Sequence, residues 1–405
     1  MAVDSPKRNY KNPSACASAF GRFFYAVDSL IYFSQVVISP SDAGRCYQAN
    51  DPTSSEIPDL LDTDGGVIEL EDSRRIKRII VYRSGILVFA ANGVWYISNP
   101  DGGFKATAFN VEKITDRGLD ATKSVIEGDS IVYYFSNNGI MQIGSNEFNV
   151  LAAVDITEST IRSYYLSNIA GKKFNGVYDE ALQQCVWWSP SIDNVGLIYD
   201  TRLQAFYPQK SNSPNVRVES PFNIVNASYW ISALETGNSL SYSFARFTNK
   251  QFKDFGTDQD AYLISGPETL GKFANKKSVT QAKVFFRKTE KQVTGYENGS
   301  YTYDTPSGCL FQARWDFDNS GAYSKFVGLT GNTGVGKEMQ LYKPMQRGFI
   351  PDEFPYDFDT GEALLSKKFN IRGNGDAVQF VFKAEPEKDL QLLGYSVNYT
   401  MRGRM

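Results

Sequence analysis

The stretch IKRIIVYRSGILVFAANGVWYIS, residues 76–98, decides the fold class. Short apolar blocks follow one another, and each block ends at a pair of turn-forming residues. The sequence predicts three antiparallel strands joined by two turns: Ile76–Tyr82, Ser84-Gly85, Ile86–Ala90, Asn92-Gly93 and Val94–Ser98. Asn-Gly between apolar strands indicates a type I′ turn, whose two central residues both take a positive φ.

The same strand–turn–strand pattern recurs along the chain at intervals of roughly 45–60 residues, a period typical of propeller blades. The turns predicted in these further copies are Asp28-Ser29, Gly128-Asp129, Asn138-Gly139, Asp179-Glu180, Asp200-Thr201 and Thr236-Gly237-Asn238. A sheet of three or four short strands leaves both faces open, and neighbouring sheets stacked around an axis bury them. The sequence therefore predicts an all-β protein that contains a β-propeller.

Composition divides the chain into predicted parts. These are an N-terminal extension over residues 1–17, a β-propeller of about five or six blades over 18–270, a linker over 271–281, and a C-terminal all-β, sandwich-like domain over 282–405. The linker is placed where GPETLGKFANKKSV turns polar and contains Gly and Lys. One helix is predicted near Thr157–Ser167.

The chain contains no histidine, which excludes Ser-His-Asp and Cys-His catalysis and any zinc site that needs imidazole. Its four cysteines form no CxxC pair, and they are Cys16, Cys46, Cys185 and Cys309. We expect them to be reduced, because no signal peptide precedes them. We also expect no membrane span, since no apolar run approaches the ~18 residues that a spanning helix needs.

The net charge of −3 bears on nucleic-acid binding. A protein that grips DNA tightly carries a basic excess or a basic stripe. Here the basic residues are interspersed with acids, and the densest basic cluster is short: Arg74, Arg75, Lys77 and Arg78. This balance argues against a tight DNA binder, but it is compatible with a channel through which a duplex slides.

The stretch GNTGVGKE, Gly331 to Glu338, matches the phosphate-loop pattern GxxxxGK. That loop needs a Ser or Thr for magnesium after the Lys, and then a helix. Here Glu338 occupies the Ser/Thr position, and Pro344 interrupts any following helix. The sequence favours a strand-connecting turn over a nucleotide site.

Two further motifs each allow a functional and a structural interpretation. LLDTDGG, Leu60 to Gly66, resembles the opening of a calcium loop, but the later ligands are missing, so Asp-stabilised turns are favoured. The pair Trp187-Trp188 could serve as a sugar-stacking platform. Adjacent residues of a strand face opposite sides of a sheet, so we expect at least one of the two to lie in the core.

Several blocks together resemble the tail tubular, or nozzle, proteins of short-tailed bacteriophages. The blocks are CYQANDPTSSEIPDLLDTDGGVIEL, IVYRSGILVFAANGVWYIS, GGFKATAFNVEKI, VGLIYDTRLQAFYP, SGCLFQARWDF and KKFNIRGNGDAVQFVFKAEPEKDLQLLGYSVNYTMRG. The resemblance covers most of the chain. It implies a structural virion protein of the tail, assembled in the host cytoplasm. The expected assembly is a homohexameric ring below the adaptor ring, with tail fibres or a tip protein nearby and double-stranded DNA passing through.

From this resemblance we expect no enzyme activity, no catalytic or metal-binding residues and no cofactor. The alternative is a carbohydrate-binding or carbohydrate-cleaving phage receptor protein, because composition does not exclude the paired carboxylates of a glycosidase. A third possibility is a cellular propeller that binds peptides. The alternative predicts that exposed aromatic residues and paired carboxylates converge in one cleft.

Overall fold

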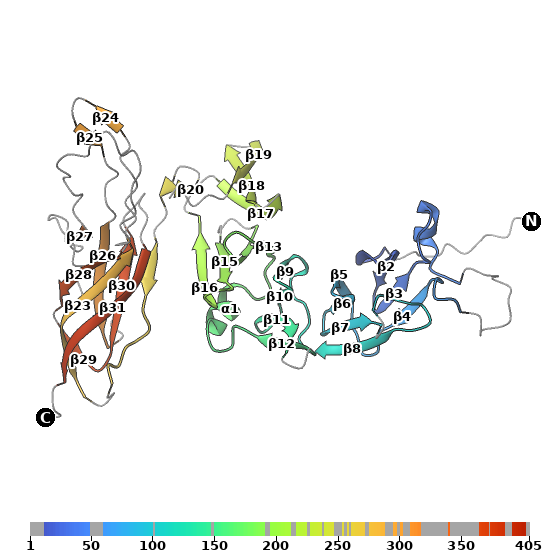
Figure 1. Ribbon diagram of the computed structural model, residues 1–405, viewed down its shortest axis with the longest axis horizontal. Helices are drawn as coiled ribbons and strands as arrows, with labels where there is room; N and C mark the ends of the chain where they lie inside the picture. Colours follow the sequence, from blue (N-terminus) through green and yellow to red (C-terminus); the bar gives the residue numbers. More distant parts are fainter. Residues whose placement is uncertain are drawn as a thin grey trace, which may run out of the picture. The chain divides into compact units, whose positions relative to one another are not determined.

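The fold is given by a computed structural model. It describes residues 12–48, 60–99, 102–146, 150–190, 195–211, 216–224, 227–236, 239–246, 253–254, 257–258, 261–271, 275–287, 295–297, 300–302, 308–316, 339–340, 364–371, 373–384 and 391–401. Within these ranges the helices are α1 (Arg162–Asn168) and the 3-10 turns η1 (Pro40–Gly44) and η2 (Thr122–Ser124). All other regular structure is β (Figure 1), which confirms the predicted all-β class.

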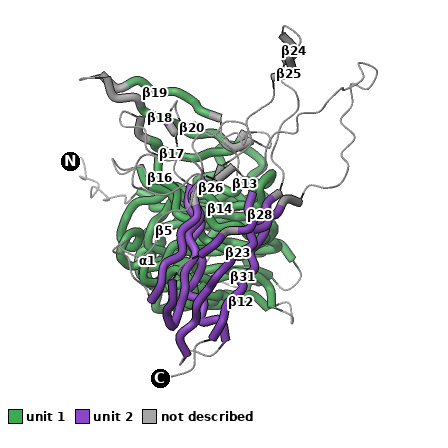
Figure 2. Tube along the Cα trace, turned by 90° about the vertical axis from the view of Figure 1, so that its left-hand side faces the viewer, with its two compact units in different colours: residues 1–247 green, residues 248–405 purple. Residues whose placement is uncertain are grey.

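The chain splits into two compact units, residues 1–247 and 248–405 (Figure 2). In the described part of the first unit, five antiparallel sheets follow one another, and the strands of each pair in chain order. Sheet 1 comprises β1 (Ala15–Ala19), β2 (Arg22–Val27), β3 (Leu30–Phe33) and β4 (Gly66–Glu69). Sheet 2 comprises β5 (Ile76–Tyr82), β6 (Gly85–Ala90), β7 (Gly93–Ser98) and β8 (Asn110–Thr115).

The remaining three sheets of this unit repeat the arrangement. Sheet 3 comprises β9 (Ile126–Gly128), β10 (Ile131–Phe135), β11 (Ile140–Ser145) and β12 (Leu151–Asp155). Sheet 4 comprises β13 (Asn175–Asp179), β14 (Gln184–Trp188), β15 (Val195–Asp200) and β16 (Ala205–Lys210). Sheet 5 comprises β17 (Val216–Ile224), β18 (Ala227–Thr236) and β19 (Ser239–Arg246).

Consecutive sheets share apolar cores. In β6, Ile86 and Val88 point into the first core, between sheets 1 and 2, while Leu87 and Phe89 point into the second, between sheets 2 and 3. Both faces of β6 are buried, so apolar side chains are needed at every position rather than at every second one. This explains the continuous apolar run GILVFA. The third core joins sheets 3 and 4, and the fourth joins sheets 4 and 5. This serial stacking is propeller-like, and the number of blades stays a prediction.

The hairpins of sheet 2 differ from the predicted turns by one residue. The loops are Arg83-Ser84 and Ala91-Asn92, so each predicted glycine begins the next strand. Neither Asn92 nor Gly93 has a positive φ, and the type I′ prediction is wrong there. Gly93 is needed because a Cβ would lie 2.8 Å from the carbonyl oxygen of Thr115 in β8.

Two successive positive φ values, the backbone signature of a type I′ turn, occur instead at Phe20 (53°) and Gly21 (69°) between β1 and β2, and at Asp129 (51°) and Ser130 (62°) between β9 and β10. The second turn lies one residue later than the predicted Gly128-Asp129, because Gly128 is the last residue of β9. The predicted turn at Asp28-Ser29 is confirmed, and Gly237-Asn238 lies outside the described residues. The predicted helix is confirmed but begins later, at Arg162. Its Tyr165 is buried in the third core, where the phenol donates to the carbonyl oxygen of Ser136 at 2.5 Å.

The second unit contains two facing sheets. One comprises β22 (Tyr262–Ile264), β30 (Val378–Ala384), β26 (Gly308–Trp315) and β27 (Met339–Gln340), and the other β28 (Leu364–Asn370), β23 (Lys277–Arg287), β29 (Asn374–Gly375) and β31 (Gln391–Met401). The short hairpins are β20 (Lys253–Asp254) with β21 (Thr257–Asp258), and β24 (Gly295–Glu297) with β25 (Ser300–Thr302). Val284, Phe311 and Phe380 share one core between the sheets, as the predicted sandwich requires.

The division between the units differs from the predicted linker at 271–281. It falls after residue 247, because β22 pairs with β30 in the second unit, although the composition changes only later. Strand β23 begins at Lys277, inside the predicted linker, and β1 begins at Ala15, inside the predicted N-terminal extension. Within the described residues, no helix is long and apolar enough to cross a membrane.

Candidate functional site

The loop Leu60–Gly66, which resembles a calcium loop, lies against a buried cation of the chain itself. Arg22 of β2 is 1% exposed. Its Nη1 donates to the carbonyl oxygens of Ser34 at 2.6 Å and Asp64 at 2.5 Å, and its Nη2 donates to that of Asp62. The loop therefore binds a guanidinium through its backbone carbonyls.

The carboxylates of this loop have partners of their own. Asp64 accepts the backbone N–H of Leu61 at 2.9 Å, and Asp62 accepts the hydroxyl of Thr107 and lies 3.7 Å from the Lys105 ammonium. Burial lowers the pKa of Arg22, and the charges of Asp64 and Asp62 oppose that shift. Among the residues described, no three Asp, Glu or Cys side chains gather as a metal site would require.

Aromatic rings cover the Arg22 guanidinium. Its Cζ lies 5.8 Å from the ring centroids of both Phe33 and Phe104, within the range of a cation–π contact. None of the sequence motifs points to this site. The available signal was the alternation in RFFYAV, because Arg22 shares the core-facing side of β2 with Phe24 and Ala26.

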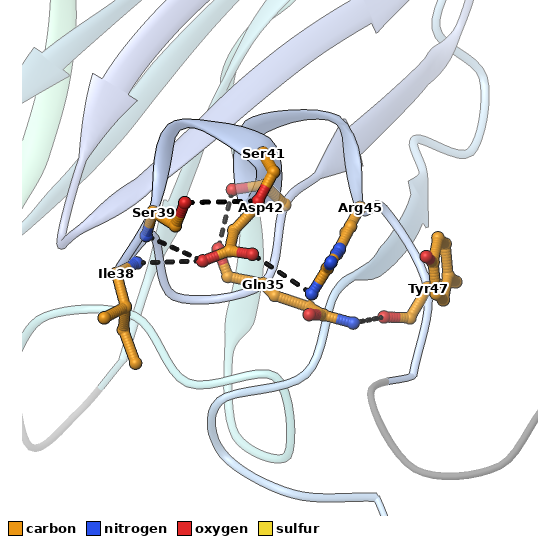
Figure 3. A network of polar contacts seen from close by, with 8 residues as sticks. Gln35, Ile38, Ser39, Ser41, Asp42, Arg45 and Tyr47 are labelled. Atoms are coloured by element: carbon orange, nitrogen blue, oxygen red, sulfur yellow. Dashed lines mark hydrogen bonds and ion pairs between the residues drawn. The ribbon is translucent and has the colours of Figure 1, made fainter.

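The segment that precedes this loop is fixed by Asp42 (Figure 3). Its carboxylate accepts the backbone N–H groups of Ser39 at 2.8 Å and Ile38 at 3.2 Å, and it lies 3.1 Å from the Arg45 guanidinium. These contacts lower the pKa of Asp42, the Ser39 N–H most of all. Gln35 donates to the carbonyl oxygen of Tyr47 at 2.9 Å and ties the two ends of the segment together.

A polar pocket of about 310 Å³ lies between turns of sheets 2 and 3. Its lining residues are Ala91, Asp116, Arg117, Gly118, Ser136, Asn137 and Asn138. The Asp116 carboxylate lies 2.5 Å from the Lys113 ammonium, and the Tyr134 phenol donates to the carbonyl oxygen of Arg117 at 2.7 Å. Glycoside hydrolysis ordinarily uses two carboxylates facing one bond, and Asp116 is the single carboxylate in this lining.

The remaining motif residues are used in packing and turns. Trp187 and Trp188 are 0% and 1% exposed, so neither offers a ring to a sugar. The carboxylates of Asp179 and Asp200 accept the backbone N–H groups of Leu182 and Leu203, three residues on, at 3.0 and 2.8 Å. They stabilise the turns that the sequence predicted at both positions.

The phosphate-loop-like stretch 331–338 lies outside the described residues. Cys16, Cys46 and Cys185 carry free thiols, as expected, and burial raises the pKa of Cys46 and of Cys185.

No protein-family model matches the chain, and no curated protein matches it. Among solved structures, the extracellular domain of a protein regarded as a one component system from B. thetaiotaomicron matches 81% of this chain with TM-score 0.34 and 10% identity. This chain spans 39% of that protein.

Glycoside hydrolases also match. An exo-β-1,3-galactanase from Phanerochaete chrysosporium matches with TM-score 0.23 and 9% identity, over 95% of both chains. An engineered GH43 glycoside hydrolase with endo-xylanase and exo-arabinofuranosidase activity matches with TM-score 0.27 and 11% identity, over 98% of both chains. All these TM-scores are low, so the fold description rests on the pairing and cores above.

Proposed function

We propose that this chain is a structural, non-enzymatic protein of a short-tailed phage, the nozzle that forms the DNA-exit channel of the tail. The observation that carries the proposal is the series of four cores that joins the five sheets of the first unit. Sheets that bury both faces against their neighbours form a rigid scaffold, which a conduit under pressure needs.

The blocks that resemble nozzle proteins support the proposal through their place in the fold. CYQANDPTSSEIPDLLDTDGGVIEL contains the loop that binds Arg22, and GGFKATAFNVEKI contains Phe104, which covers its guanidinium. IVYRSGILVFAANGVWYIS supplies β6 and β7, which connect the first two cores. The resemblance thus falls on residues that hold consecutive sheets together.

The proposal includes a homohexameric ring in the virion tail, assembled in the host cytoplasm, with an adaptor ring and tail fibres or a tip protein as neighbours. A cyclic ring needs two different surfaces that complement each other head to tail. The net charge of −3 suits a channel wall, because a duplex that must leave quickly gains nothing from tight binding.

Immunogold labelling of phage particles from the source culture, viewed by negative-stain electron microscopy, tests the proposal. We expect label on the tail stalk between head and distal tip, and none after the antibody is absorbed with the purified chain. Label confined to peripheral fibres would favour the receptor-binding or carbohydrate-cleaving alternative. Particles without label would overturn the phage assignment.

A further inference from the structure

The turn between β10 and β11 contains an Asn-Gly pair, Asn138-Gly139, that lies outside any strand. In the other Asn-Gly pairs that the structure describes, the glycine belongs to a strand: Gly93 begins β7, Gly176 lies in β13 and Gly375 ends β29. Pairing in a sheet holds these glycines in extended backbone. The backbone of Asn138-Gly139 is free of that constraint.

The side chain of Asn138 is also free to change its conformation. It is exposed, and its amide makes no hydrogen bond to any other residue that the structure describes. Asn92 precedes a glycine in the corresponding hairpin of sheet 2, but its amide is held at both ends. Its Oδ1 accepts the backbone N–H of Arg74 at 2.8 Å, and its Nδ2 donates to the carbonyl oxygen of Asp72 at 2.6 Å. The two Asn-Gly pairs therefore have the same local chemistry and different restraint.

The turn at residues 136–139 does not depend on the Asn138 side chain. It is closed by Ser136, whose backbone N–H and hydroxyl both donate to the carbonyl oxygen of Gly139 at 2.9 Å. Asn138 has no positive φ, so the backbone does not call for asparagine here either. The backbone N–H of Gly139 donates to no residue in the described ranges. The amide of Asn138 and the nitrogen of Gly139 are therefore both available to react with each other.

We propose that Asn138 is a site of spontaneous deamidation. The backbone nitrogen of Gly139 bonds to Cγ of Asn138, and the bond from Cγ to Nδ2 breaks. The proton of the Gly139 N–H leaves with Nδ2 as ammonia, and a succinimide ring remains. Water then opens the ring and leaves aspartate or isoaspartate at position 138. Glycine favours the first step because it has no side chain to shield its nitrogen.

The reaction would add a negative charge to the polar pocket between sheets 2 and 3, which Asn138 lines together with Asp116 and Arg117. Asp116 is already paired with Lys113 at 2.5 Å, whereas the Arg117 guanidinium makes no ion pair within the described part of the chain. Opposite charges in one pocket attract, so the product gains a partner that the amide lacks. Deamidation would thus change the charge that this pocket presents.

Peptide mapping of the full-length chain tests the proposal. Folded and urea-unfolded samples are kept in the same mildly alkaline buffer with heavy-oxygen water and then digested at acidic pH. Mass spectrometry measures isoaspartate and heavy oxygen at each Asn-Gly pair. In the folded chain the hydrogen bonds that hold the Asn92 amide must break before it reacts, so Asn138 should react about tenfold faster or more. In urea the two rates should converge.

Substituted chains assign the change in charge. Gly139 is kept, because a Cβ there would lie 2.6 Å from both carboxylate oxygens of Asp155. Isoelectric focusing of the incubated chain should show a more acidic form, and Asn138→Gln should suppress the first such form to appear, since glutamine closes the corresponding ring slowly. Asn137→Gln is the matched control and should retain it, because residue 137 is not followed by glycine.

Two results would overturn the proposal. One is an equal rate at Asn92 and Asn138 in the folded chain. The other is an absence of isoaspartate at position 138 over a time in which the unfolded chain forms it. Neither result depends on the tail assignment, which immunogold labelling tests separately.

Discussion

Trp187 and Trp188 are neighbours in β14, yet each is buried in a different apolar core. Trp187 lies in the third core with its ring centroid 5.0 Å from that of Phe135, and Trp188 lies in the fourth core, 4.8 Å from Trp230. One strand thereby joins sheet 4 to both of its neighbours. The two indoles differ in one respect: Trp187 Nε1 donates to the carbonyl oxygen of Ser124 at 2.7 Å, whereas Trp188 Nε1 has no partner among the described residues.

This difference predicts unequal costs for the same substitution. Trp187→Phe removes ring volume and a buried hydrogen bond, whereas Trp188→Phe removes ring volume alone. We expect both to lower the free energy of unfolding, Trp187→Phe by about 1 kcal/mol more, the typical net contribution of a buried hydrogen bond. Urea unfolding followed by circular dichroism measures both. Equal losses would contradict the role given to the Ser124 contact.

Much of the first unit could be predicted from sequence because its strand order is local. Each strand pairs with the next in the chain, so the apolar run at 76–98 indicates both the strands and their neighbours. The boundary between units could not be found this way. Leu263 of β22 pairs with Phe382 of β30, a partner far along the chain, and no local composition marks that contact.

The candidate sites were harder to predict than the strands. For LLDTDGG the sequence favoured Asp-stabilised turns, and Asp64 does accept the backbone N–H of Leu61. The contact of this loop with Arg22 could not be predicted, because Arg22 lies in another strand and binds backbone carbonyl oxygens, which every residue has. Likewise, Asn-Gly favours positive φ, yet the close approach of β8 decides the role of Gly93. Side-chain chemistry can be read locally, whereas close approach between elements cannot.

Gly93→Ala tests that close approach. A Cβ at this position would lie 2.8 Å from the Thr115 carbonyl oxygen and 3.1 Å from the Trp95 ring, so β7 and β8 must move apart. We expect a loss of about 1–3 kcal/mol in the free energy of unfolding, the usual cost of overpacking, and a larger loss for Gly93→Val. Gly44→Ala, with nothing within 4 Å of its Cβ and no positive φ, is the matched control and should be near neutral.

Arg22→Met tests the buried guanidinium. The substitution leaves the carbonyl oxygens of Ser34, Asp62 and Asp64 without their donor in a closed site, so we expect a loss of about 3–5 kcal/mol in the free energy of unfolding. Arg162→Met removes an exposed arginine paired with Glu158 at 3.4 Å and should cost at most about 0.5 kcal/mol.

Calcium provides an independent check on the same loop. Because the guanidinium occupies the carbonyl oxygens, we expect millimolar calcium or a chelator to leave the thermal unfolding midpoint unchanged. A calcium-dependent rise in the midpoint of the unsubstituted chain would contradict the assignment of Arg22 as the bound cation.

Tyr178 predicts how stability depends on pH in the alkaline range. Its phenol, on a side chain 6% exposed, donates to the Asp129 carboxylate, and burial, followed by that hydrogen bond, raises its pKa from the ordinary value of 10 to about 12. The folded state thus favours the neutral phenol. Its stabilising effect is complete below pH 10 and is lost as the pH rises toward 12. The free energy of unfolding should fall across this window.

Tyr178→Phe should make that fall shallower. The substitution removes one phenol that loses its proton more easily in the unfolded chain than in the folded one. Other buried tyrosines, such as Tyr133, whose pKa is also raised by burial, retain the rest of the slope. Urea unfolding at intervals from pH 8 to about 11.5, within the range of tyrosine ionisation, measures the difference. Tyr262→Phe, at a side chain 53% exposed, is the control, and an identical slope in the two variants would contradict the protonated Tyr178–Asp129 pair.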